Sequence, residues 1–251
     1  MYEGTCITTA YLTPAWLCPC RGYVHSVFHR VANVMLQNGE AQRMLALTMP
    51  GLPRLPDSVC LPGPVLETLE PGMPAWLDKD KFQLNGRSFS LRTDNGWSGR
   101  IEPMNGQPDV RTFLQATENL TSGLDSLPSG IRRRAEGALL SPEAGRFLGL
   151  GRGLTPSFDD ACVGVMAVCR AFGQAAPFAL TCLEDTTDVS ARYLRLAQEG
   201  YFGQPVADVV DAVYGCGSLA RAIPDLLAVG ATSGSDMLWG MRMYFLKMRN
   251  I

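Results

Sequence analysis

The chain lacks both a strong excess of charge and a long hydrophobic run. Its 251 residues carry 22 Lys and Arg against 24 Asp and Glu, a formal net charge of -2. General binders of nucleic acid or of membrane surfaces carry a basic excess, so we expect neither as a partner. No apolar run reaches the roughly 18–20 residues that a membrane span needs. No basic segment precedes an apolar stretch at the N-terminus, which favours a cytoplasmic protein without a signal peptide.

Several catalytic signatures are also missing. No Gly-Lys-[Ser/Thr] follows the glycine-rich segment 149–153, which excludes a Walker A loop, and its Gly-x-Gly-x-Gly spacing differs from the dinucleotide fingerprint. No Gly-x-Ser-x-Gly elbow is present. The two histidines, His25 and His29, both lie near the N-terminus, which disfavours a Ser-His-Asp triad.

The eight cysteines are scattered, and Cys18-x-Cys20 is the one close pair. Secreted disulfide scaffolds are shorter and denser in cysteine, so we expect reduced, mostly buried thiols. A zinc site from Cys18, Cys20 and His25 is the alternative, although structural zinc sites usually show two spaced ligand pairs. We therefore expect no metal and no other cofactor.

The patterning predicts an α+β protein in two parts. Residues 1–105 are expected to form a β-rich barrel or sandwich, because short branched apolar segments alternate with turn signals. Segments 24–34 and 43–47 flank one such turn at 37–40, and Asn85-Gly86 predicts a hairpin within 82–91. The prolines between residues 50 and 74 favour extended connections rather than helices.

Residues 106–251 are expected to form an all-helical domain, because helical spacing dominates there. Ser141-Pro142-Glu143 has the form of an N-cap followed by a first turn. The predicted helices are 110–120, 129–140, a short one from 142, 161–172, 187–198, 205–213, 219–227 and 237–248.

The most informative feature of the sequence is a pattern that occurs twice. Ser157-x-x-Asp160-x-x-x-Gly164 is matched by Ser233-x-x-Asp236-x-x-x-Gly240, and each copy leads into a strongly apolar segment. A serine with an acid three residues on is close to a capping box at a helix start. The glycine lies one turn after the acid on the same face, where another backbone or a ligand can come close. The pattern predicts two capped, buried helices.

Two interpretations of the repeat stay open at this point. In one, both motifs only cap and pack helices. In the other, both helix starts converge on one pocket, where backbone N–H groups and the helix dipoles favour a small anion. Arg152 would then supply a counter-charge, or else be a solvent-exposed arginine. The residues that would bind the ligand are Gly151, Arg152, Gly153, Thr155, Ser157, Ser233 and Gly234.

Three aspartates argue for chemistry beyond capping. Asp159 and Asp160 are adjacent and cannot both point at one place on a helix, and Asp236 repeats the position of Asp160. An acid beside an anion is unfavourable unless it accepts hydrogen bonds from an N–H-bearing substrate, binds a metal or serves as a base. A substrate with both a carboxylate and an amide meets this need. We predict Asp159, Asp160 and Asp236 as catalytic residues.

Two further segments carry weaker signals. His25 and Ser26, within 22–28, are further candidates for substrate binding, although a lone histidine in such a segment is more often structural. The basic cluster 131–134 is expected to be a solvated helix face.

The sequence resembles the AllH-like family. Segment 149–160, Gly-Leu-Gly-Arg-Gly-Leu-Thr-Pro-Ser-Phe-Asp-Asp, is similar to the family signature Gly-Leu-Gly-x-Gly-Leu-Thr-Pro-Ser-Gly-Asp-Asp. Segment 229–236 resembles the second signature, Gly-x-[Ser/Thr]-Ser-Gly-x-Asp, and segment 22–33 resembles the N-terminal Val-x-Ser-Val-Phe. The resemblance spans roughly residues 20–245.

The resemblance implies a subunit of oxamate carbamoyltransferase, from anaerobic allantoin breakdown, that works with partner subunits. That enzyme converts oxalurate and phosphate into oxamate and carbamoyl phosphate. The expected ligand is thus a small anion: phosphate, oxamate or an oxalurate-like substrate. By the same resemblance, Asp160 and Asp236 would orient the substrate amide or accept hydrogen bonds from it. The anion site would be lined by Gly153, Thr155 and Ser157, with a further hydroxyl from Ser233.

Two positions depart from the family pattern. Phe158 stands where the signature has glycine, and Arg152 stands where proline is common. A bulky Phe158 at a pocket mouth is expected to exclude the family substrate or change it. The alternatives are a divergent member with another small substrate, and a non-catalytic subunit or ligand-binding protein for a small carboxylate.

Overall fold

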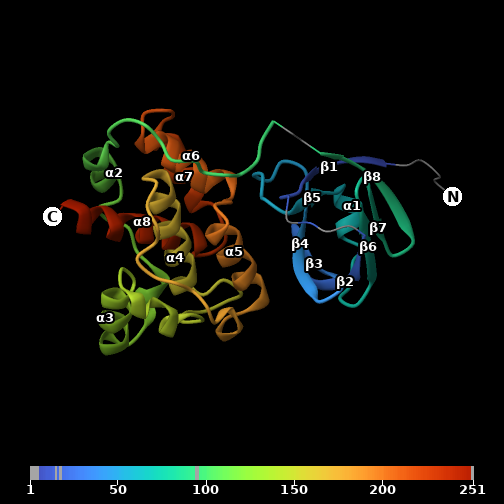
Figure 1. Cartoon of the computed structure of the whole chain (residues 1–251), viewed down its shortest axis with the longest axis horizontal. Coiled ribbons are helices and arrows are strands. Elements are labelled where there is room, and N and C mark those ends of the chain that lie inside the picture. The colour runs from blue at the N-terminus through green and yellow to red at the C-terminus, as the bar shows by residue number, and fades with distance from the viewer. Residues whose placement is uncertain (1–5, 15, 17–18, 94–95, 250–251) are drawn as a thin grey trace. The chain divides into compact units, whose positions relative to one another are not determined.

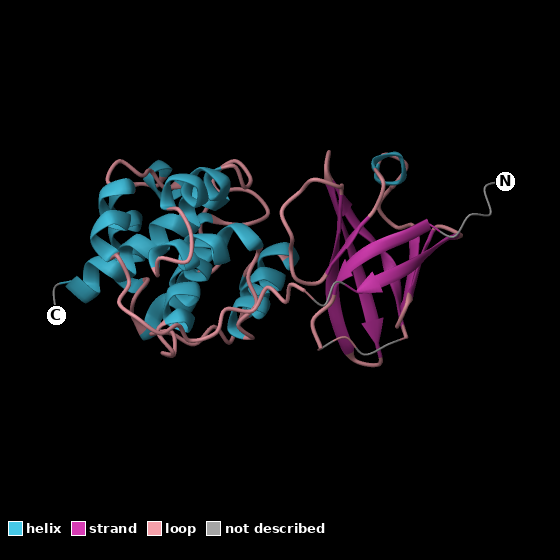
Figure 2. Cartoon of the chain, turned by 90° about the horizontal axis from the view of Figure 1, so that it is seen from above, coloured by secondary structure: helices cyan, strands magenta, loops and turns pink. Residues whose placement is uncertain are grey.

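The chain divides into a strand-rich unit and a helical unit, residues 1–99 and 100–251. The computed structural model describes residues 6–14, 16, 19–93 and 96–249. Figure 2 shows the strands in one unit and, apart from one short helix, the helices in the other. The predicted fold class is confirmed, and the β-rich part is a barrel rather than a sandwich. No helix in the described part is long and apolar enough to cross a membrane.

The first unit is a closed barrel, with strand order β1-β5-β4-β3-β2-β6-β7-β8 (Figure 1). Strand β1 closes it by pairing parallel with β8 and antiparallel with β5. Closure leaves no long unpaired edge, and the interior is filled by side chains such as Leu45, Leu47 and Phe82, which are fully buried. The strands are β1 (Cys6–Tyr11), β2 (Cys20–Val27), β3 (Val31–Asn38), β4 (Ala41–Thr48), β5 (Ser58–Cys60), β6 (Pro74–Asp78), β7 (Lys81–Leu84) and β8 (Arg87–Thr93).

The turns of the barrel follow the sequence signals where glycine marks them. The hairpin at Asn85-Gly86 is confirmed, because Leu84 pairs with Arg87 and both turn residues have positive φ. Segment 24–34 is instead two strands, since β2 ends at Val27 and β3 begins at Val31. Its turn, Phe28-His29-Arg30, contains neither glycine nor proline. The proline-rich stretch includes one helical turn, α1 (Gly63–Leu66), with Pro64 in the first turn, where proline is tolerated.

The second unit confirms the predicted helical domain. Its helices are α2 (Val110–Ala116), α3 (Ser129–Ala138), α4 (Ser157–Ala171), α5 (Asp188–Gln198), α6 (Gln204–Val213), α7 (Leu219–Leu227) and α8 (Ser233–Arg249). The short helix expected from Pro142 is a 3-10 turn, η2 (Pro142–Phe147), and Ser141 caps it as predicted, accepting from the Glu143 N–H at 3.3 Å. Two more 3-10 turns are η1 (Gly123–Ser126) and η3 (Leu183–Asp185).

Helices α4 and α8 cross with their backbones in contact (Figure 1). A Cβ placed on Gly164 would lie 2.0 Å from the Met237 carbonyl oxygen, and one on Gly240 would lie 2.0 Å from the Ala161 carbonyl oxygen. The contact is reciprocal, because each motif glycine faces the residue that follows the aspartate of the other motif. This part of the packing interpretation is confirmed, and it sets the two motifs side by side.

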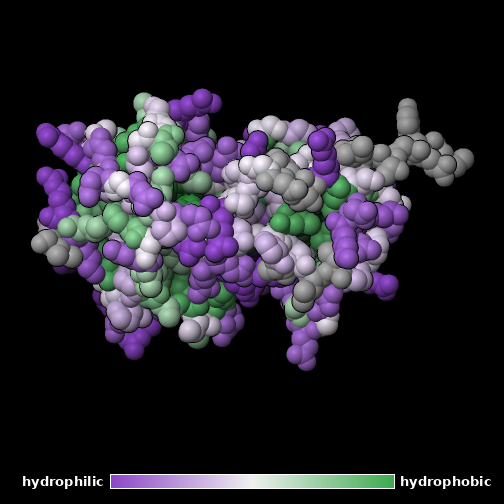
Figure 3. Space-filling model, turned by 45° about the horizontal axis from the view of Figure 1, so that its top comes forward, coloured by the Kyte–Doolittle hydropathy of each residue, from purple (hydrophilic) through white to green (hydrophobic). Residues whose placement is uncertain are grey.

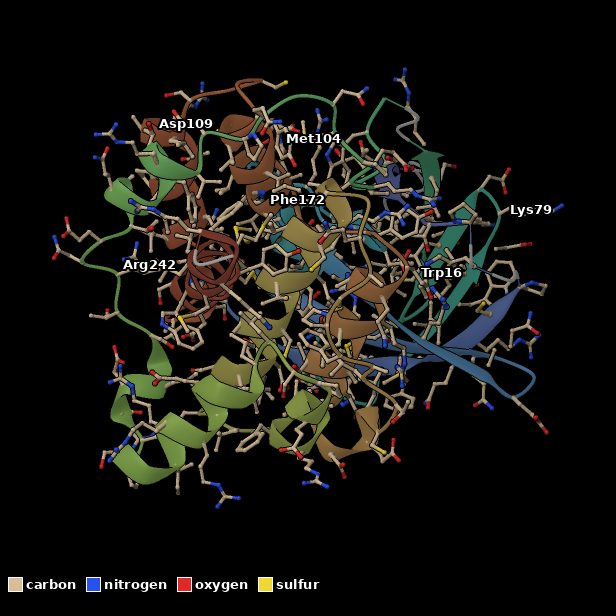
Figure 4. The ribbon with its side chains drawn as sticks, turned by 60° about the vertical axis from the view of Figure 1, so that its left-hand side comes forward. Trp16, Lys79, Met104, Asp109, Phe172 and Arg242 are labelled. Atoms are coloured by element: carbon tan, nitrogen blue, oxygen red, sulfur yellow. The ribbon has the colours of Figure 1, made fainter. Side chains whose placement is uncertain are left out.

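The C-terminal ends of the same two helices are held by aromatic and polar contacts. Phe172, just after α4, packs against Phe245 of α8 and Tyr214, with ring centroids 6.3 and 5.9 Å away. Arg242 of α8 donates to the Leu114 carbonyl of α2 at 2.7 Å. Phe172 and Arg242 are both labelled in Figure 4.

Hydrophobic residues on the face shown in Figure 3 form small areas among hydrophilic ones. The large apolar side chains that are exposed come from separate segments of the chain, such as Tyr23 and Phe28 of the barrel unit and Ile131, Leu154 and Leu227 of the helical unit. Scattered exposure of this kind is normal for a globular surface.

Gly164→Ala and Gly240→Ala are expected to destabilise the protein, because each new methyl group would meet a backbone carbonyl that cannot rotate away. Overpacking of this kind costs about 1–3 kcal/mol and occasionally more. Gly137→Ala in α3 is the control, because nothing lies within 4 Å of a Cβ there, and alanine favours a helix interior by roughly 0.5–1 kcal/mol. Urea denaturation followed by circular dichroism would measure all three. Equal stability of Gly164→Ala and Gly137→Ala would contradict the close crossing.

Candidate functional site

The two motifs meet at the N-terminal ends of α4 and α8. The hydroxyl oxygens of Thr155 and Ser233 are 2.7 Å apart, although 78 residues separate them in the sequence. Both side chains are half-buried. The two helix starts therefore share one small polar cluster, which also contains Ser157, Asp160 and Asp236.

Asp236 is the most completely held carboxylate of this cluster. Its Oδ1 accepts from the Ser122 hydroxyl at 2.6 Å and from the Gly123 N–H at 2.7 Å. Its side chain is fully buried. Burial raises the pKa of Asp236, while interactions with the hydroxyls of Ser122 and Ser157 act in the opposite direction. Helix α8 is therefore tied to the segment that leads into η1.

Asp160 occupies the equivalent place on α4, and 1% of its surface is exposed. Burial raises the pKa of Asp160 well above its ordinary value, and the nearby charge of Asp236 adds to the increase. The hydroxyls of Ser233 and Thr155 lower it. Each motif aspartate thus interacts with the serine of the other motif, Asp160 with Ser233 and Asp236 with Ser157.

Asp159 points to a different place, as its adjacency to Asp160 requires. It accepts from the Gly149 N–H at 2.9 Å, from the Ser190 hydroxyl at 2.6 Å and from the Thr186 hydroxyl. Burial raises the pKa of Asp159, and these hydrogen bonds lower it. The side chain, which is fully buried, fastens the glycine-rich loop to the start of α5.

The predicted capping role of Ser157 is wrong. The N-cap is Pro156, Ser157 is the first helical residue, and no side chain caps the helix. Neighbouring carbonyls take up the N–H groups instead, since Phe158 donates to Leu150 at 3.0 Å and Asp159 donates to Pro156 at 3.0 Å. The Ser157 hydroxyl is left to reach across to α8.

The glycine-rich loop has the backbone that its composition suggests. Gly149, Gly151 and Gly153 all have positive φ, which side-chain-bearing residues rarely adopt. A Cβ on Gly151 would lie 2.4 Å from the Ser157 nitrogen, so the loop passes directly over the start of α4. Gly153 has open space around it, and Arg152 is exposed. Of the predicted ligand residues, Arg152 and Gly153 are therefore the accessible part of the loop.

Gly234 lies at a close contact between two helices. A Cβ there would lie 1.8 Å from the Leu226 carbonyl oxygen, so the start of α8 lies against α7. Its N–H donates to the Val229 carbonyl at 3.1 Å. The expectation that Gly234 binds substrate is not supported by this geometry.

Phe158 does not stand at a pocket mouth. Its side chain is fully buried, and its ring packs against Phe147, with centroids 5.6 Å apart. Phe158 follows an exposed loop in the sequence, but at its place on the helix the side chain points into the core. Its departure from the family pattern therefore changes core packing and not a pocket entrance.

His25 and Ser26 belong to the barrel unit, on β2. The His25 Nδ1 lies 3.2 Å from the Ser26 hydroxyl, which also accepts from the Asn33 amide at 3.0 Å. A β-bulge lies between Val24 and Ser26. These contacts are made within the barrel unit.

Ser122 and Gly123 are site residues that the sequence reasoning missed. Their signal was present, because Ser122 and Asp125 have capping-box spacing and do form a capping box for η1. A Cβ on Gly123 would lie 2.2 Å from the Ser157 hydroxyl oxygen and 3.2 Å from Asp236 Oδ2. The cluster is therefore closed on this side by backbone alone.

The remaining features singled out in the sequence are the basic cluster 131–134 and the cysteines. Arg132 pairs with Asp125 and Glu136, which confirms a solvated helix face. Cys162 and Cys169 are free and buried, whereas Cys182 and Cys216 are free and exposed. Cys20 is buried. Cys18, proposed in the zinc alternative, lies outside the described residues. Within those residues, no three His, Cys, Asp or Glu side chains group as a metal site.

A cavity of about 330 Å³ lies between α3 and η2, lined in part by Ile131, Arg134, Arg146 and Phe147. None of the residues of the two motifs lines it. The polar cluster and this cavity are therefore separate features of the helical unit.

Two family models match the chain. One, described as oxamate carbamoyltransferase subunit AllH, matches residues 147–245, and the other, the AllH family N-terminal domain, matches residues 8–97. Together they cover most of the sequence, and the chain belongs to the AllH family. The resemblance seen in the motifs is thereby confirmed. No solved structure matches the chain.

The buried carboxylates predict that the free energy of unfolding depends on pH. The measurement is made with a chelator present, so that only protons bind to the carboxylates. A carboxyl whose pKa is raised by folding binds more protons in the folded state, so its contribution to the free energy of unfolding is largest at low pH. It is lost as the pH rises from the ordinary value of 3.8 through the raised folded value. The free energy of unfolding of the wild type should therefore fall with pH relative to Asp160→Asn. Parallel curves for the two proteins between about pH 4 and pH 8 would contradict the assignment.

Proposed function

We propose that this protein is a subunit of an oxamate carbamoyltransferase and binds a small carbamoyl-bearing carboxylate at the paired starts of α4 and α8. Membership of the family supports the enzyme class. The ligand proposed is oxalurate, or oxamate together with phosphate.

The observation that carries the proposal is the contact between the Thr155 and Ser233 hydroxyls. Both hydroxyls are half-buried and belong to different motifs, and two fully buried carboxylates lie behind them. A hydroxyl can donate one hydrogen bond and accept others. One proton is used between the two hydroxyls and the other faces Asp160, so the pair suits the amide N–H groups of a ligand such as oxalurate.

Charge for the anionic part of the ligand comes from the exposed side of the loop. Arg152 offers a planar guanidinium that binds carboxylate or phosphate through two parallel hydrogen bonds. The open backbone at Gly153 leaves room for such a group beside the start of α4, whose dipole also favours an anion. This assigns ligand contact to Arg152, Gly153, Thr155 and Ser233.

In this proposal the aspartates position the hydroxyls and the glycine-rich loop and do not contact the ligand. Asp160 and Asp236 are too deeply buried to touch the ligand, and they orient the hydroxyls of the opposite motif. Asp159 positions the glycine-rich loop through the Gly149 N–H. All three are therefore positioning residues rather than groups that contact the reacting atoms.

The transfer itself needs little from the protein beyond alignment. A phosphate oxygen attacks the carbamoyl carbon of oxalurate, the bond from that carbon to the oxamate nitrogen breaks, and carbamoyl phosphate and oxamate form. The proton that hydrogen phosphate gives up is the proton that the departing nitrogen gains. The touching hydroxyls of Thr155 and Ser233 can pass that proton, because each donates and accepts at once.

A second candidate is a non-catalytic subunit that only binds a small carboxylate. The burial of all three aspartates favours it, because no exposed base or nucleophile stands in the cluster. The purified chain, assayed alone for phosphate-dependent cleavage of oxalurate, separates the two. Turnover without partner subunits excludes the second candidate.

Thr155→Ala and Ser233→Ala are expected to weaken oxamate or oxalurate binding about tenfold or more. A hydrogen bond to a charged group contributes about 1.5–3 kcal/mol, and 1.4 kcal/mol corresponds to a factor of ten. Isothermal titration calorimetry on the folded variants measures the change.

Ser235→Ala is the matched control, because its hydroxyl, on the same first turn, donates to the Thr232 carbonyl at 2.7 Å. Thr155→Ser retains the hydroxyl and should keep most of the affinity. If both alanine variants bind as tightly as Ser235→Ala, the motifs serve helix packing alone.

A further inference from the structure

The helical unit buries two carboxylates close together without a cationic partner. Asp160 and Asp236 are each at least 99% buried, and the charge of one acts on the other. Among the residues that the structure describes, no Lys, Arg or His forms an ion pair with either. Burying an ionised carboxylate without compensation is costly, so something must balance this charge.

One oxygen of each carboxylate has no hydrogen-bond partner in the described part of the chain. Oδ2 of Asp160 and Oδ2 of Asp236 are buried and make no hydrogen bond within the described part of the chain. Buried polar atoms are nearly always partnered, and an exception needs an explanation such as a bound ion. Oδ1 of Asp236, in contrast, already accepts from Ser122 and Gly123.

Hydroxyl oxygens interact with both carboxylates. The hydroxyls of Ser233 and Thr155 act on Asp160, and the hydroxyl of Ser157 acts on Asp236. The Gly123 backbone closes this side of the group, since a Cβ there would lie 2.2 Å from the Ser157 hydroxyl oxygen and 3.2 Å from Asp236 Oδ2. Carboxylate and hydroxyl oxygens are ligands typical of hard cations such as Mg²⁺, Mn²⁺ and Ca²⁺.

We propose that Asp160 Oδ2 and Asp236 Oδ2 bind one hard divalent cation between the starts of α4 and α8. The two positive charges of the ion balance the two carboxylates. Because the donor set holds two carboxylates completed by hydroxyls, it differs from sites built on three or more acidic, histidine or cysteine side chains. The inference stands apart from the proposed function, although a cation here would also place positive charge beneath an anionic ligand.

The test is metal binding by the full chain without any substrate. The protein is stripped with a chelator and titrated with Mn²⁺, with binding followed by electron paramagnetic resonance and by the melting temperature. One saturable site per chain, displaced by Mg²⁺ or Ca²⁺, and a higher melting temperature in the presence of the ion are expected. Absence of a saturable site means that protons alone compensate the pair, and this would overturn the proposal.

Asp160→Asn and Asp236→Asn locate the site, because each removes one charged ligand and keeps the shape. Both are expected to lose the saturable Mn²⁺ binding. Asp211→Asn on α6 is the control for unspecific binding to a surface acid and should retain it. Retained binding in the first two variants would place the ion elsewhere and contradict the assignment.

Ser122→Ala provides a second test of the site if the two asparagine variants do not fold. Its hydroxyl holds Asp236 through the other carboxylate oxygen, at 2.6 Å. Loss of such an outer partner weakens metal binding by about 10- to 100-fold. Unchanged Mn²⁺ affinity in Ser122→Ala would count against the site. Because no substrate is present, these results are independent of the oxamate and oxalurate titrations.

Discussion

The contact between the backbones of α4 and α8 is the constraint on which the rest of the helical unit depends. Gly164 and Gly240 bring each helix against a carbonyl of the other, and no side chain fits between them. The crossing fixes the rotation of both helices, so that Asp160 and Asp236, one turn earlier, lie on the facing sides. The hydroxyls of the two motifs then meet at their N-terminal ends, where Thr155 contacts Ser233. A repeated pattern in the sequence thus becomes one site, because each half supplies the hydroxyl that the other half's aspartate uses.

The site has an outer and an inner layer with different chemistry. The outer layer, made of Arg152, the open loop at Gly153 and the two touching hydroxyls, is accessible and suits a small carboxylate with amide groups. The inner layer consists of two buried carboxylates, which orient the outer hydroxyls and need a balancing charge. A divalent cation in the inner layer would stiffen the crossing and reduce repulsion between an anionic ligand and the acids behind it.

Local signals in the sequence predicted much of the fold. The Asn85-Gly86 turn and the cap at Ser141 depend on neighbours within a few residues, and the structure confirms them. The spacing of the two motif glycines predicted a close backbone approach, which is also confirmed, although it did not identify the partner residues. The partners of the polar side chains could not be predicted in this way. Spacing assigns Ser157 to its own helix start, whereas tertiary packing turns its hydroxyl toward Asp236, and Ser122 reaches the same carboxylate from 114 residues away. Phe158 was misjudged for a similar reason, because its place after a glycine loop does not show which way the helix faces.

The central claim is that the two motifs act as a single binding site. A double-mutant cycle on oxamate binding with Thr155→Ala and Ser233→Ala tests it most directly. Groups in one hydrogen-bonded network show coupling energies of about 0.5–3 kcal/mol, whereas independent sites add within about 0.3–0.5 kcal/mol. We expect the double variant to lose clearly less affinity than the sum of the two single losses. Additive losses, or no loss in either single variant, would contradict it.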